Sequence, residues 1–412
     1  LARKLRVQGF DWRELFETGL IDDCTGDWEY FSHIVNIAMM LKSEALWSLF
    51  GENDAEEFAN SAVEYLNKKH GSAIGHFNGD ENLSGTSPIQ GAELCSIVEL
   101  MYSYEILFSI TGNTEWLDRL ELLAYNSLPA TLSPDMWTHQ YDQMVNQTAA
   151  FPMSKQPFRT NNNEAHLFGL EPHFGCCTAN FGQGFPKFAL STFLKAENGI
   201  ASCSLAPSSV ESAINGVGVK CSLATEYPFR GKLKYTVEVE SLVEFDFLIR
   251  IPSFAKSARV DGTGVKCGEF AKISKTWTGK TDIEVCLDFE TEIVKRPHDM
   301  ACVRRGPLFY SIPIKEKRER VEYIKDGVER KYPYCDYYIY PESKWNYAFA
   351  SDKFEFEELP YNVPFNPENP PAAIEAEAVG IEWGFNCGHC DRLPASREPI
   401  SDVQRIRLIP YG

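Results

Sequence analysis

The chain has 412 residues, of which 44% are hydrophobic and 13% aromatic, so it is long enough for two or three domains with sizeable cores. A net charge of −18 argues against nucleic acid or an anionic membrane surface as a partner. No stretch approaches the ~18 unbroken apolar residues of a membrane span, and the twelve cysteines are too thinly spread for a small disulfide scaffold.

The first part of the chain, residues 1–195, is expected to be a helical domain. Residues 53–71 and 91–112 carry apolar side chains at helical spacing, and residues 115–128 follow after a very short turn. A last helix is expected from Asn180 towards Ala196. Paired helices with short turns and long loops between the pairs indicate a helical bundle or an α/α toroid.

From residue 196 the apolar residues recur at every second position. Residues 232–240, 245–252 and 282–290 alternate in this way, and Gly, Pro and Asn turns separate the runs. This pattern is typical of an antiparallel β-sandwich, which we place at residues 196–345. We expect residues 346–412 to form a proline-rich loop and a β segment that packs back on the sandwich. The fold class is therefore α plus β, in several domains.

Most cysteines need no special chemistry. The strand-like runs contain several of them, and we expect these to be buried free thiols because cysteine is among the most often buried residue types. They are Cys203, Cys221, Cys286 and Cys302.

Two short motifs bring cysteines together with a carboxylate. Glu93 and Cys95 in QGAELCS would point in nearly opposite directions in a regular helix, so they converge only if the first turn is irregular, which Gly91 allows. Cys176 and Cys177 are adjacent in FGCCTAN. Three sulfurs and one carboxylate suit tetrahedral Zn²⁺. The spacing matches no general zinc rule, so core thiols or reactive thiols remain alternatives.

Two further stretches carry reactive or recognition groups. CGHC at residues 387–390 is the frame of disulfide isomerases, but its flanks lack the βαβ context that this chemistry needs, and a loop disulfide or an incidental pair is the alternative. Residues 134–147 combine Trp137 and His139 with amide side chains. They could form a sugar-binding wall, or a loop packed under its own aromatic rings.

Three stretches in chain order, residues 75–105, 119–147 and 167–188, resemble glycoside hydrolase family 127. This family comprises β-L-arabinofuranosidases and related enzymes of plant-glycan breakdown. The resemblance runs from about residue 5 to 315, with a weaker similarity at RIRLIPYG. It implies an (α/α)₆ toroid of twelve helices, of which the helical residues here make about half. We therefore expect a partial toroid with exposed apolar helix faces, and the remainder before Leu1.

The resemblance also implies roles for individual residues. The family's zinc ligands match Glu93, Cys95, Cys176 and Cys177. Cys176 matches the nucleophile as well, and Glu81 is the best match for the general acid/base, although Asp80 is adjacent. The expected sugar contacts are His33, Glu121, Tyr125 and Asn126, and the aromatic loop adds Trp137 and His139.

The implied chemistry is physically coherent. Zn²⁺ would remove the thiol proton and hold the thiolate in place, and a carboxylic acid would serve the leaving group and then activate water. We expect a retaining glycosidase that acts on β-L-arabinofuranosides or related sugars, with zinc as cofactor and a carbohydrate as partner. The alternative is a catalytically inactive remnant that binds glycans or acts as a scaffold. The sequence indicates neither the sugar and linkage nor the compartment or oligomeric state.

Overall fold

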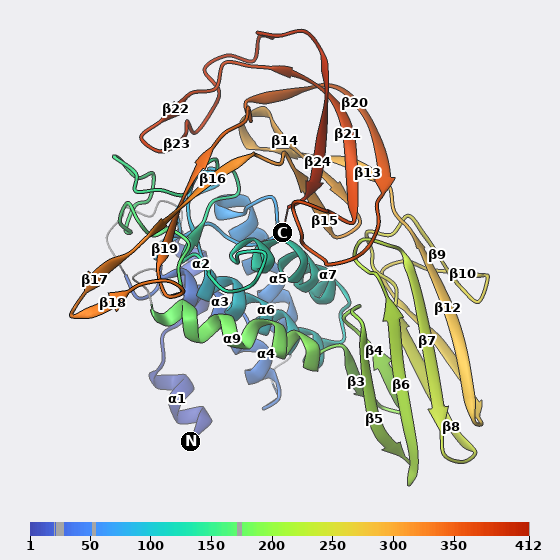
Figure 1. Ribbon diagram of the computed structural model, residues 1–412. Helices are drawn as coiled ribbons and strands as arrows, with labels where there is room; N and C mark the ends of the chain where they lie inside the picture. The colour runs from blue at the N-terminus through green and yellow to red at the C-terminus, as the bar shows by residue number, and fades with distance from the viewer. Residues whose placement is uncertain (20, 22–28, 52–54, 171–174, 412) are drawn as a thin grey trace.

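Helices occupy the N-terminal part of the chain and strands the C-terminal part (Figure 1). The computed structural model describes residues 1–19, 21, 29–51, 55–170 and 175–411. Its helices are α1 (Ala2–Gln8), α2 (Trp12–Thr18), α3 (Ile34–Met40), α4 (Ser43–Ser48), α5 (Ala55–His70), α6 (Leu94–Thr111), α7 (Glu115–Leu122), the π-helical turn η1 (Leu123–Ser127), α8 (Leu128–Ala130) and α9 (Gly175–Leu190).

Helix α6 is the core of the helical part. It packs against α3 and α9, and most of its side chains are buried. Gly112 ends it in the left-handed conformation (φ 73°), and α7 begins only three residues later, as the short turn in the sequence predicts. By length and composition alone α6 could cross a membrane, but two thirds of it is buried inside this fold, as in the core helix of a globular domain.

Helix α9 differs from the helix that the sequence predicts. It begins at Gly175 rather than Asn180 and ends at Leu190, so the two adjacent cysteines lie in its first turn. Glycines and Pro186 inside the helix weaken the helical signal in the sequence. Gly184 is nevertheless required by packing, because a Cβ there would lie 2.8 Å from the Leu128 side chain. Close approach of two helices, which the sequence does not reveal, therefore requires a glycine inside this helix.

An irregular segment, residues 131–170, connects α8 to α9. Its only named strand in the described part is β2 (Asp142–Gln143), which pairs antiparallel with β1 (Ala92–Glu93) at the start of α6. In this short ladder Glu93 lies opposite Asp142. The segment is thereby fixed across the N-terminal end of α6.

Two sheets follow the helices. Their strands are β3 (Phe193–Ala196), β4 (Gly199–Ser202), β5 (Ser208–Ile214), β6 (Val217–Thr225), β7 (Lys232–Val239), β8 (Val243–Arg250), β9 (Ser257–Val260), β10 (Thr263–Val265), β11 (Phe270–Trp277) and β12 (Lys280–Asp288). The orders are β10-β9-β12-β7-β6-β5 and β11-β8-β4-β3. Tyr235 of β7 packs edge-on against Phe247 of β8 with ring centroids 5.5 Å apart, so the apolar faces of the two sheets meet.

Alternation decides which cysteines are buried in these strands. Cys203 and Cys221 are buried free thiols, as expected. Cys286 and Cys302 are only partly buried, which corrects the expectation for them. In β12 the inward positions belong to Ile283, Val285 and Leu287, so the cysteine between them turns outward.

A third sheet joins residues that the sequence analysis assigned to two regions. Its strands are β13 (Thr291–Arg296), β14 (Met300–Arg305), β15 (Leu308–Ser311), β20 (Tyr347–Glu358), β21 (Ala372–Gly380) and β24 (Gln404–Pro410). The order is β13-β14-β15-β24-β21-β20. Because β24 pairs with both β15 and β21, the sheets divide near residue 289 rather than at the expected boundary after 345.

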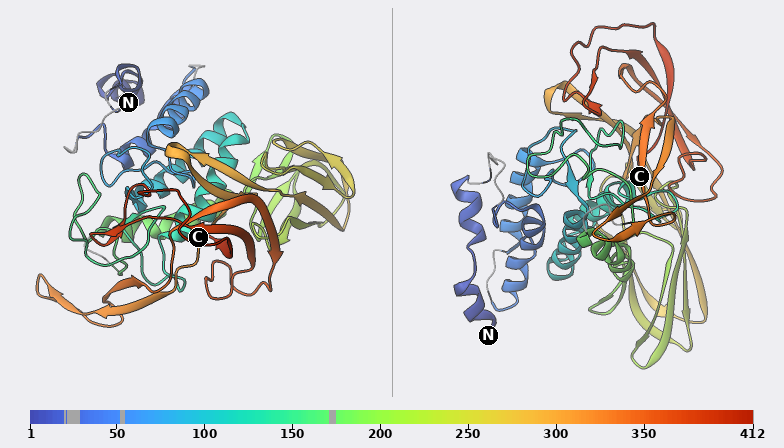
Figure 2. Two further views of the ribbon diagram at one scale, coloured as in Figure 1. Left: turned by 90° about the horizontal axis from the view of Figure 1, so that it is seen from above. Right: turned by 60° about the vertical axis from the view of Figure 1, so that its left-hand side comes forward.

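A hairpin arm projects from the third sheet towards the irregular segment. It consists of β16 (Glu316–Val321), β17 (Tyr323–Lys325), β18 (Val328–Arg330) and β19 (Asp336–Pro341). Backbone hydrogen bonds of 2.9 and 2.7 Å join it to Phe168 and Ala150 of that segment. The two further views place α1 at the edge of the molecule away from strands β5–β12 (Figure 2).

Candidate metal and active site

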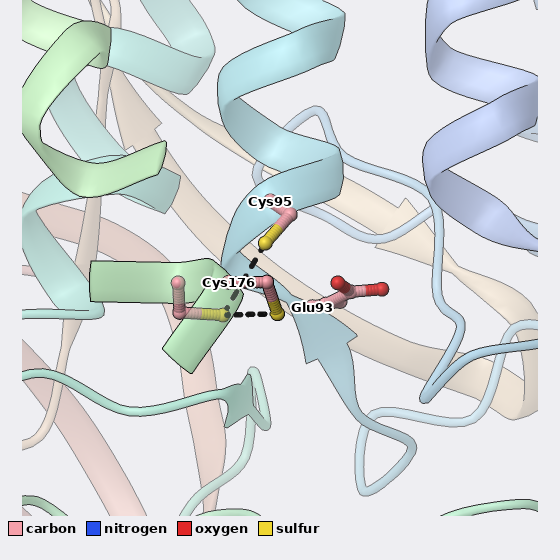
Figure 3. Close-up of side chains that lie close together, drawn as sticks. Glu93, Cys95 and Cys176 are labelled. Carbon is pink, nitrogen blue, oxygen red and sulfur yellow. Dashed lines mark hydrogen bonds between the residues drawn. The ribbon is translucent and has the colours of Figure 1, made fainter. Parts of the chain in front are cut away.

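Three sulfurs and one carboxylate converge where the start of α6 meets the start of α9 (Figure 3). The Sγ atom of Cys177 is 3.4 Å from that of Cys95 and 4.0 Å from that of Cys176. One ligand atom from each of these cysteines and from Glu93 lies within 4.8 Å of the others. We call these four residues the sulfur cluster.

A change of backbone conformation lets Glu93 and Cys95 meet. Glu93 is extended (φ −63°, ψ 130°) and ends β1, whereas Cys95 already lies in the first turn of α6. This is the irregularity that the sequence requires for convergence. Gly91 contributes because a Cβ there would lie 2.8 Å from Cγ of Asp142, so only glycine lets β1 and β2 approach this closely.

The donor set fits Zn²⁺ by number, chemistry and spacing. Zinc–sulfur bonds of about 2.3 Å at tetrahedral angles place two sulfurs about 3.8 Å apart, and the observed separations of 3.4 and 4.0 Å lie on either side of this value. All three cysteines are free thiols. Glu93 adds a carboxylate oxygen within 4.8 Å of these sulfurs, so the set has the four donors of a tetrahedral zinc site.

The four groups differ in how strongly they hold a proton. Burial raises the pKa of Glu93 to about 8, and the neighbouring Glu81 and Cys176 add to the effect. Hydrogen bonds with Cys177 and Cys95 lower the pKa of Cys176 to about 3. Hydrogen bonding with Cys176 raises the pKa of Cys95, and burial raises that of Cys177. Cys176 is therefore the sulfur that carries negative charge most readily.

Cys176 is also the one exposed residue among the three cysteines, whereas Cys95 and Cys177 are buried. It lies in the first turn of a helix of 16 residues, where the helix dipole favours a negative charge. An incoming molecule would thus meet the sulfur that is most easily ionised.

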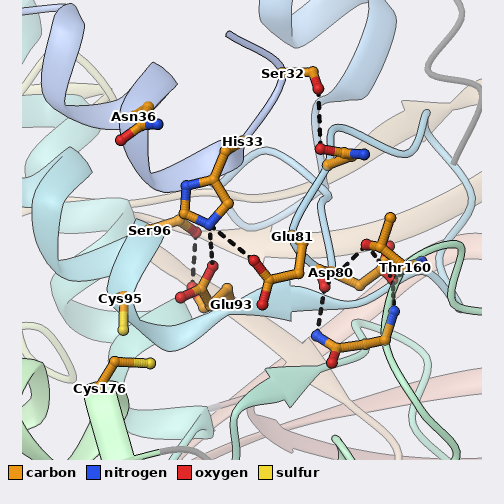
Figure 4. Close-up of polar contacts among 12 residues, drawn as sticks. Ser32, His33, Asn36, Asp80, Glu81, Glu93, Cys95, Ser96, Thr160 and Cys176 are labelled. Carbon is orange, nitrogen blue, oxygen red and sulfur yellow. Dashed lines mark hydrogen bonds and ion pairs between the residues drawn. The ribbon is translucent and has the colours of Figure 1, made fainter. Parts of the chain in front are cut away.

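A second group of polar side chains adjoins the sulfur cluster (Figure 4). His33 Nε2 lies 3.0 Å from Oε2 of Glu81 and 3.6 Å from Oε2 of Glu93. The Tyr141 hydroxyl donates a hydrogen bond to Oε1 of Glu81. With 26% of its side chain exposed, Glu81 is held by two neighbours and still reaches solvent.

Asp80, the residue before Glu81, has a structural role. It is fully buried, and its Oδ2 accepts hydrogen bonds from the backbone N–H groups of Thr160 and Asn161 at 2.7 and 2.8 Å. Asp80 therefore ties down the irregular segment. Of the two adjacent acids, Glu81 is the one that lies beside Glu93 and the sulfurs.

Three expected sugar contacts lie away from this site, which corrects the sequence analysis. Glu121 is fully buried and forms an ion pair of 2.6 Å with Arg250 of β8. Tyr125 donates to the backbone carbonyl of Leu205, and Asn126 bonds to backbone groups at the start of β15. All three fasten α7 and η1 to strands or to the connection between β4 and β5. Their helical spacing suits such a contact as well as a ligand contact, and the sequence does not reveal which strand lies opposite.

The two residues from the aromatic loop occupy different places. Trp137 is 43% exposed, and its indole N–H donates to the carbonyl of Pro333 on the hairpin arm at 2.8 Å. His139 is buried with Nε2 3.1 Å from the hydroxyl of Thr178, two residues after Cys176. His139 thus supports the first turn of α9, and Trp137 lies on the outer surface beside the arm.

Tyr141 is the residue at this site whose role the sequence did not single out. It lies within the aromatic loop, immediately before β2. The pairing of β2 with β1 brings it to Glu81. A ladder of two residues leaves no detectable pattern, so only the loop's mixture of rings and amides pointed to this segment.

The CGHC motif forms a tight hairpin rather than a redox frame. Cys387 has a positive φ of 59° between β22 (Phe385–Asn386) and β23 (His389–Cys390). Both its cysteines are free thiols, and Cys390 exchanges hydrogen bonds with Asn146. Redox chemistry at this motif requires the first cysteine at the start of a helix, whereas Cys387 leads directly into strand β23.

Comparison with known proteins places the sulfur cluster in a recognised catalytic region. Residues 35–190 match the family description "β-L-arabinofuranosidase, GH127 catalytic domain", and residues 200–289 match the GH127 middle domain. Both the sulfur cluster and Glu81 lie within the first match. A search of curated proteins by sequence finds no match.

Solved structures share the fold at low sequence identity. A GH127 β-L-arabinofuranosidase from Geobacillus stearothermophilus T6 has a TM-score of 0.64 at 18% identity over 92% of this chain and 58% of that chain. A protein described as a glycoside hydrolase gives 0.65 at 16% identity over 100% and 71%, and the GH127 β-arabinofuranosidase BT3674 gives 0.60 at 15% over 100% and 65%. The chain thus spans little more than half the length of the Geobacillus protein.

Proposed function

Since the chain is a GH127-like protein, we propose that it acts as a retaining glycoside hydrolase on β-L-arabinofuranosides or related sugars of plant glycans. One observation carries the proposal. Cys176, which is exposed and readily ionised, and Glu81 both lie beside the carboxylate of Glu93, and two buried cysteines complete the group. The fold similarity extends over only part of each solved relative. We therefore propose the activity for a chain that corresponds to part of such an enzyme.

Cys176 is the proposed nucleophile. Its residue is exposed, the pKa of its thiol is lowered to about 3 by hydrogen bonds with Cys177 and Cys95, and the start of α9 stabilises its charge. Bound Zn²⁺, held by the sulfur cluster, would supply a fixed positive charge that keeps all three sulfurs deprotonated. Cys95 and Cys177 would then anchor α6 to α9 behind the reacting sulfur.

Glu81 is the proposed acid and base. In the first step the Cys176 sulfur bonds to the anomeric carbon, the bond to the leaving oxygen breaks, and Glu81 gives its proton to that oxygen. In the second step Glu81 takes a proton from water, the water oxygen bonds to the anomeric carbon, and the carbon–sulfur bond breaks. His33 and Tyr141 orient the carboxyl through its two oxygens.

Metal content and hydrolysis test the proposal together. We expect about one zinc per purified chain and release of the chromophore from an aryl β-L-arabinofuranoside. Glu81→Gln should keep the zinc and reduce turnover by about 10²–10⁴-fold, as the loss of a general acid does. Absence of zinc, or turnover that is unchanged in Glu81→Gln, would contradict the proposed site.

A second candidate is a protein that binds glycans without turnover. The observation that favours it is the exposure of apolar side chains at the C-terminal end of α4, where Leu49 and Phe50 are 66% and 54% exposed. These side chains lie in a chain that spans only part of its solved relatives. This candidate predicts glycan affinity without hydrolysis and no effect of Glu81→Gln on binding.

A further inference from the structure

We propose that His33, Glu81 and Glu93 form a second divalent-cation site beside the sulfur cluster, and that its occupancy inhibits the enzyme. The cation chemistry it suits is that of Zn²⁺ with nitrogen and oxygen ligands. The existence of the site rests on geometry, on an unsatisfied buried oxygen and on charge. Its inhibitory effect rests on the proposed function, because it acts through Glu81.

The three side chains have the spacing of metal ligands. One ligand atom of each lies within 4.8 Å of the other two. Zinc bonds of about 2.0–2.2 Å to nitrogen and oxygen place neighbouring ligand atoms about 3.4 Å apart. The observed distances from His33 Nε2 are 3.0 Å to Glu81 Oε2 and 3.6 Å to Glu93 Oε2. In Figure 4 the imidazole ring lies to one side of the two carboxylates, and one of its nitrogens faces both.

Hydrogen bonding within the group leaves one oxygen unsatisfied. A proton on His33 Nε2 can form a hydrogen bond to Glu81 Oε2, which is 3.0 Å away. Glu93 Oε2 is 3.6 Å away, which is too far for a hydrogen bond. Glu93 Oε2 is therefore buried without a hydrogen-bond partner among the described residues, on a side chain that is only 3% exposed. A cation between the three side chains would satisfy this oxygen, which a histidine proton does not.

Charge favours a second cation at the same place. Three thiolates and one carboxylate around Zn²⁺ leave a net charge of about −2 in the sulfur cluster. Glu81 adds a further carboxylate beside it, and the ion pairs found for Glu81 and Glu93 in the described chain involve only His33. Because Glu93 has two oxygens, one can serve the sulfur cluster and the other the second site.

Occupancy would remove the acid that the reaction needs. A cation bound to Oε2 of Glu81 uses the lone pair that otherwise carries the transferable proton, so Glu81 cannot protonate the leaving oxygen. The enzyme would then need one zinc ion and be inhibited by a second. Free zinc concentration would set the active fraction.

Cobalt titration of the full chain after removal of metal distinguishes the two sites by their ligands. The first equivalent should give the intense sulfur-to-cobalt charge-transfer absorption of thiolate ligands. A weaker second equivalent should add only the d–d bands of nitrogen and oxygen ligands, with no new charge-transfer absorption. Metal counting by mass spectrometry after equilibrium dialysis should give two equivalents at high free metal and one at low.

Two variants and one control locate the second equivalent. His33→Ala and Glu81→Gln should each weaken it by about tenfold or more while the first equivalent, which also reports correct folding, remains. His298→Asn, at an exposed histidine before β14, should change neither equivalent. Binding of a single equivalent at all metal concentrations, or a second equivalent that persists in both variants, would overturn the site.

Excess zinc tests the inhibitory role separately. Turnover should fall about tenfold or more as the second equivalent binds, over the same range of free zinc. A second equivalent that binds without slowing turnover would overturn the inhibition. A chain that shows both equivalents but hydrolyses nothing would instead count against the proposed function, so the two failures are distinguishable.

Discussion

Two buried clusters of charged side chains in this molecule differ in how completely their oxygens are paired. Around Arg250, both oxygens of Glu121 and both oxygens of Asp118 accept hydrogen bonds from Arg250, Tyr227 or backbone N–H groups. In the sulfur cluster, Glu93 Oε2 has no hydrogen-bond partner in the described chain, and three thiols crowd beside it.

The difference separates structural from ligand-binding chemistry. A buried carboxylate costs free energy unless it is paired, so the cluster around Arg250, whose carboxylate oxygens are all paired, holds α7 against β8 and needs no ligand. The incompletely paired Glu93 needs something that the protein itself does not supply. Between these two clusters, the unsatisfied carboxylate oxygen, rather than burial or charge as such, marks the one that can take a ligand.

The strongest test removes the proposed nucleophile. Cys176→Ala should reduce turnover by about 10⁴-fold or more, equivalent to roughly 5 kcal/mol of transition-state stabilisation. Stability of the metal-free chain should change little, because Cys176 is exposed. Hydrolysis of the aryl arabinofuranoside measures the effect, with Cys387→Ala, another exposed cysteine, as the matched control. Equal activity of the two variants would remove the sulfur from the mechanism.

The next prediction concerns how strongly zinc binding to the sulfur cluster depends on pH. Near neutral pH the folded chain holds protons on Glu93, whose pKa is about 8, and on Cys95 and Cys177, whose pKa values are raised, but not on Cys176, whose pKa is about 3. Zinc binding should therefore release about three protons, and affinity should fall by roughly 10²–10³-fold per pH unit on acidification.

Calorimetry in buffers of different ionisation enthalpy measures that proton release. Cys95→Ser should lower the number of released protons and weaken binding. The cluster around Arg250 should contribute nothing, since its carboxylates are already paired with a cation. Zinc binding without proton release would contradict the assigned protonation of the sulfur cluster.

Removing the ion pairs of Arg250 should lower the stability of the fold rather than the rate of hydrolysis. Arg250→Met leaves Glu121 and Asp118 buried without their cation and should lower the free energy of unfolding by about 3–5 kcal/mol. Arg304→Met is the matched control, because its pair with Glu292 is exposed and should contribute less than about 1 kcal/mol. Denaturant titration measures both, and loss of zinc from folded Arg250→Met would show that the clusters are not independent.

The smallest expected effect concerns the hydrogen bond from Tyr141 to Glu81. Tyr141→Phe removes one hydrogen bond to its carboxyl and should slow turnover about tenfold, with zinc content unchanged. Tyr323→Phe is a matched control, because Tyr323 donates a similar bond of 2.8 Å to Asp336 away from the site. If both variants have equal turnover, Tyr141 does not position Glu81.

Local patterns in the sequence predicted the elements, but not how distant elements meet. The alternation in residues 232–240 correctly places Leu233, Tyr235 and Val237 on a buried face, since period two is a property of each strand alone. The start of α9 and the grouping of β15 with β24 were missed. The grouping of the strands depends on pairing between residues far apart in the chain, and the glycines and Pro186 inside α9 weaken its helical signal.

The same distinction, between local patterns and contacts of distant elements, explains which site residues were predicted correctly. Residue chemistry and family resemblance together indicated Glu93, Cys95, Cys176 and Cys177, and the fold brings them within ligand distance. Glu121 was misassigned because its partner, Arg250, lies 129 positions away and belongs to a strand rather than to a helix. Nothing in a helical spacing distinguishes a side chain that faces a cavity from one that faces a neighbouring domain.

The separation of Cys95 and Cys177 along the chain gives the sulfur cluster a mechanical role. They lie 82 positions apart, and the loop between them includes the irregular segment 131–170. An ion that bound both ends would act as a cross-link, and closing a loop of this length restricts the unfolded chain by about 4–5 kcal/mol in the disulfide approximation. Loss of the ion would therefore lower the stability of the fold that positions Tyr141, and it would remove the metal from the site at the same time.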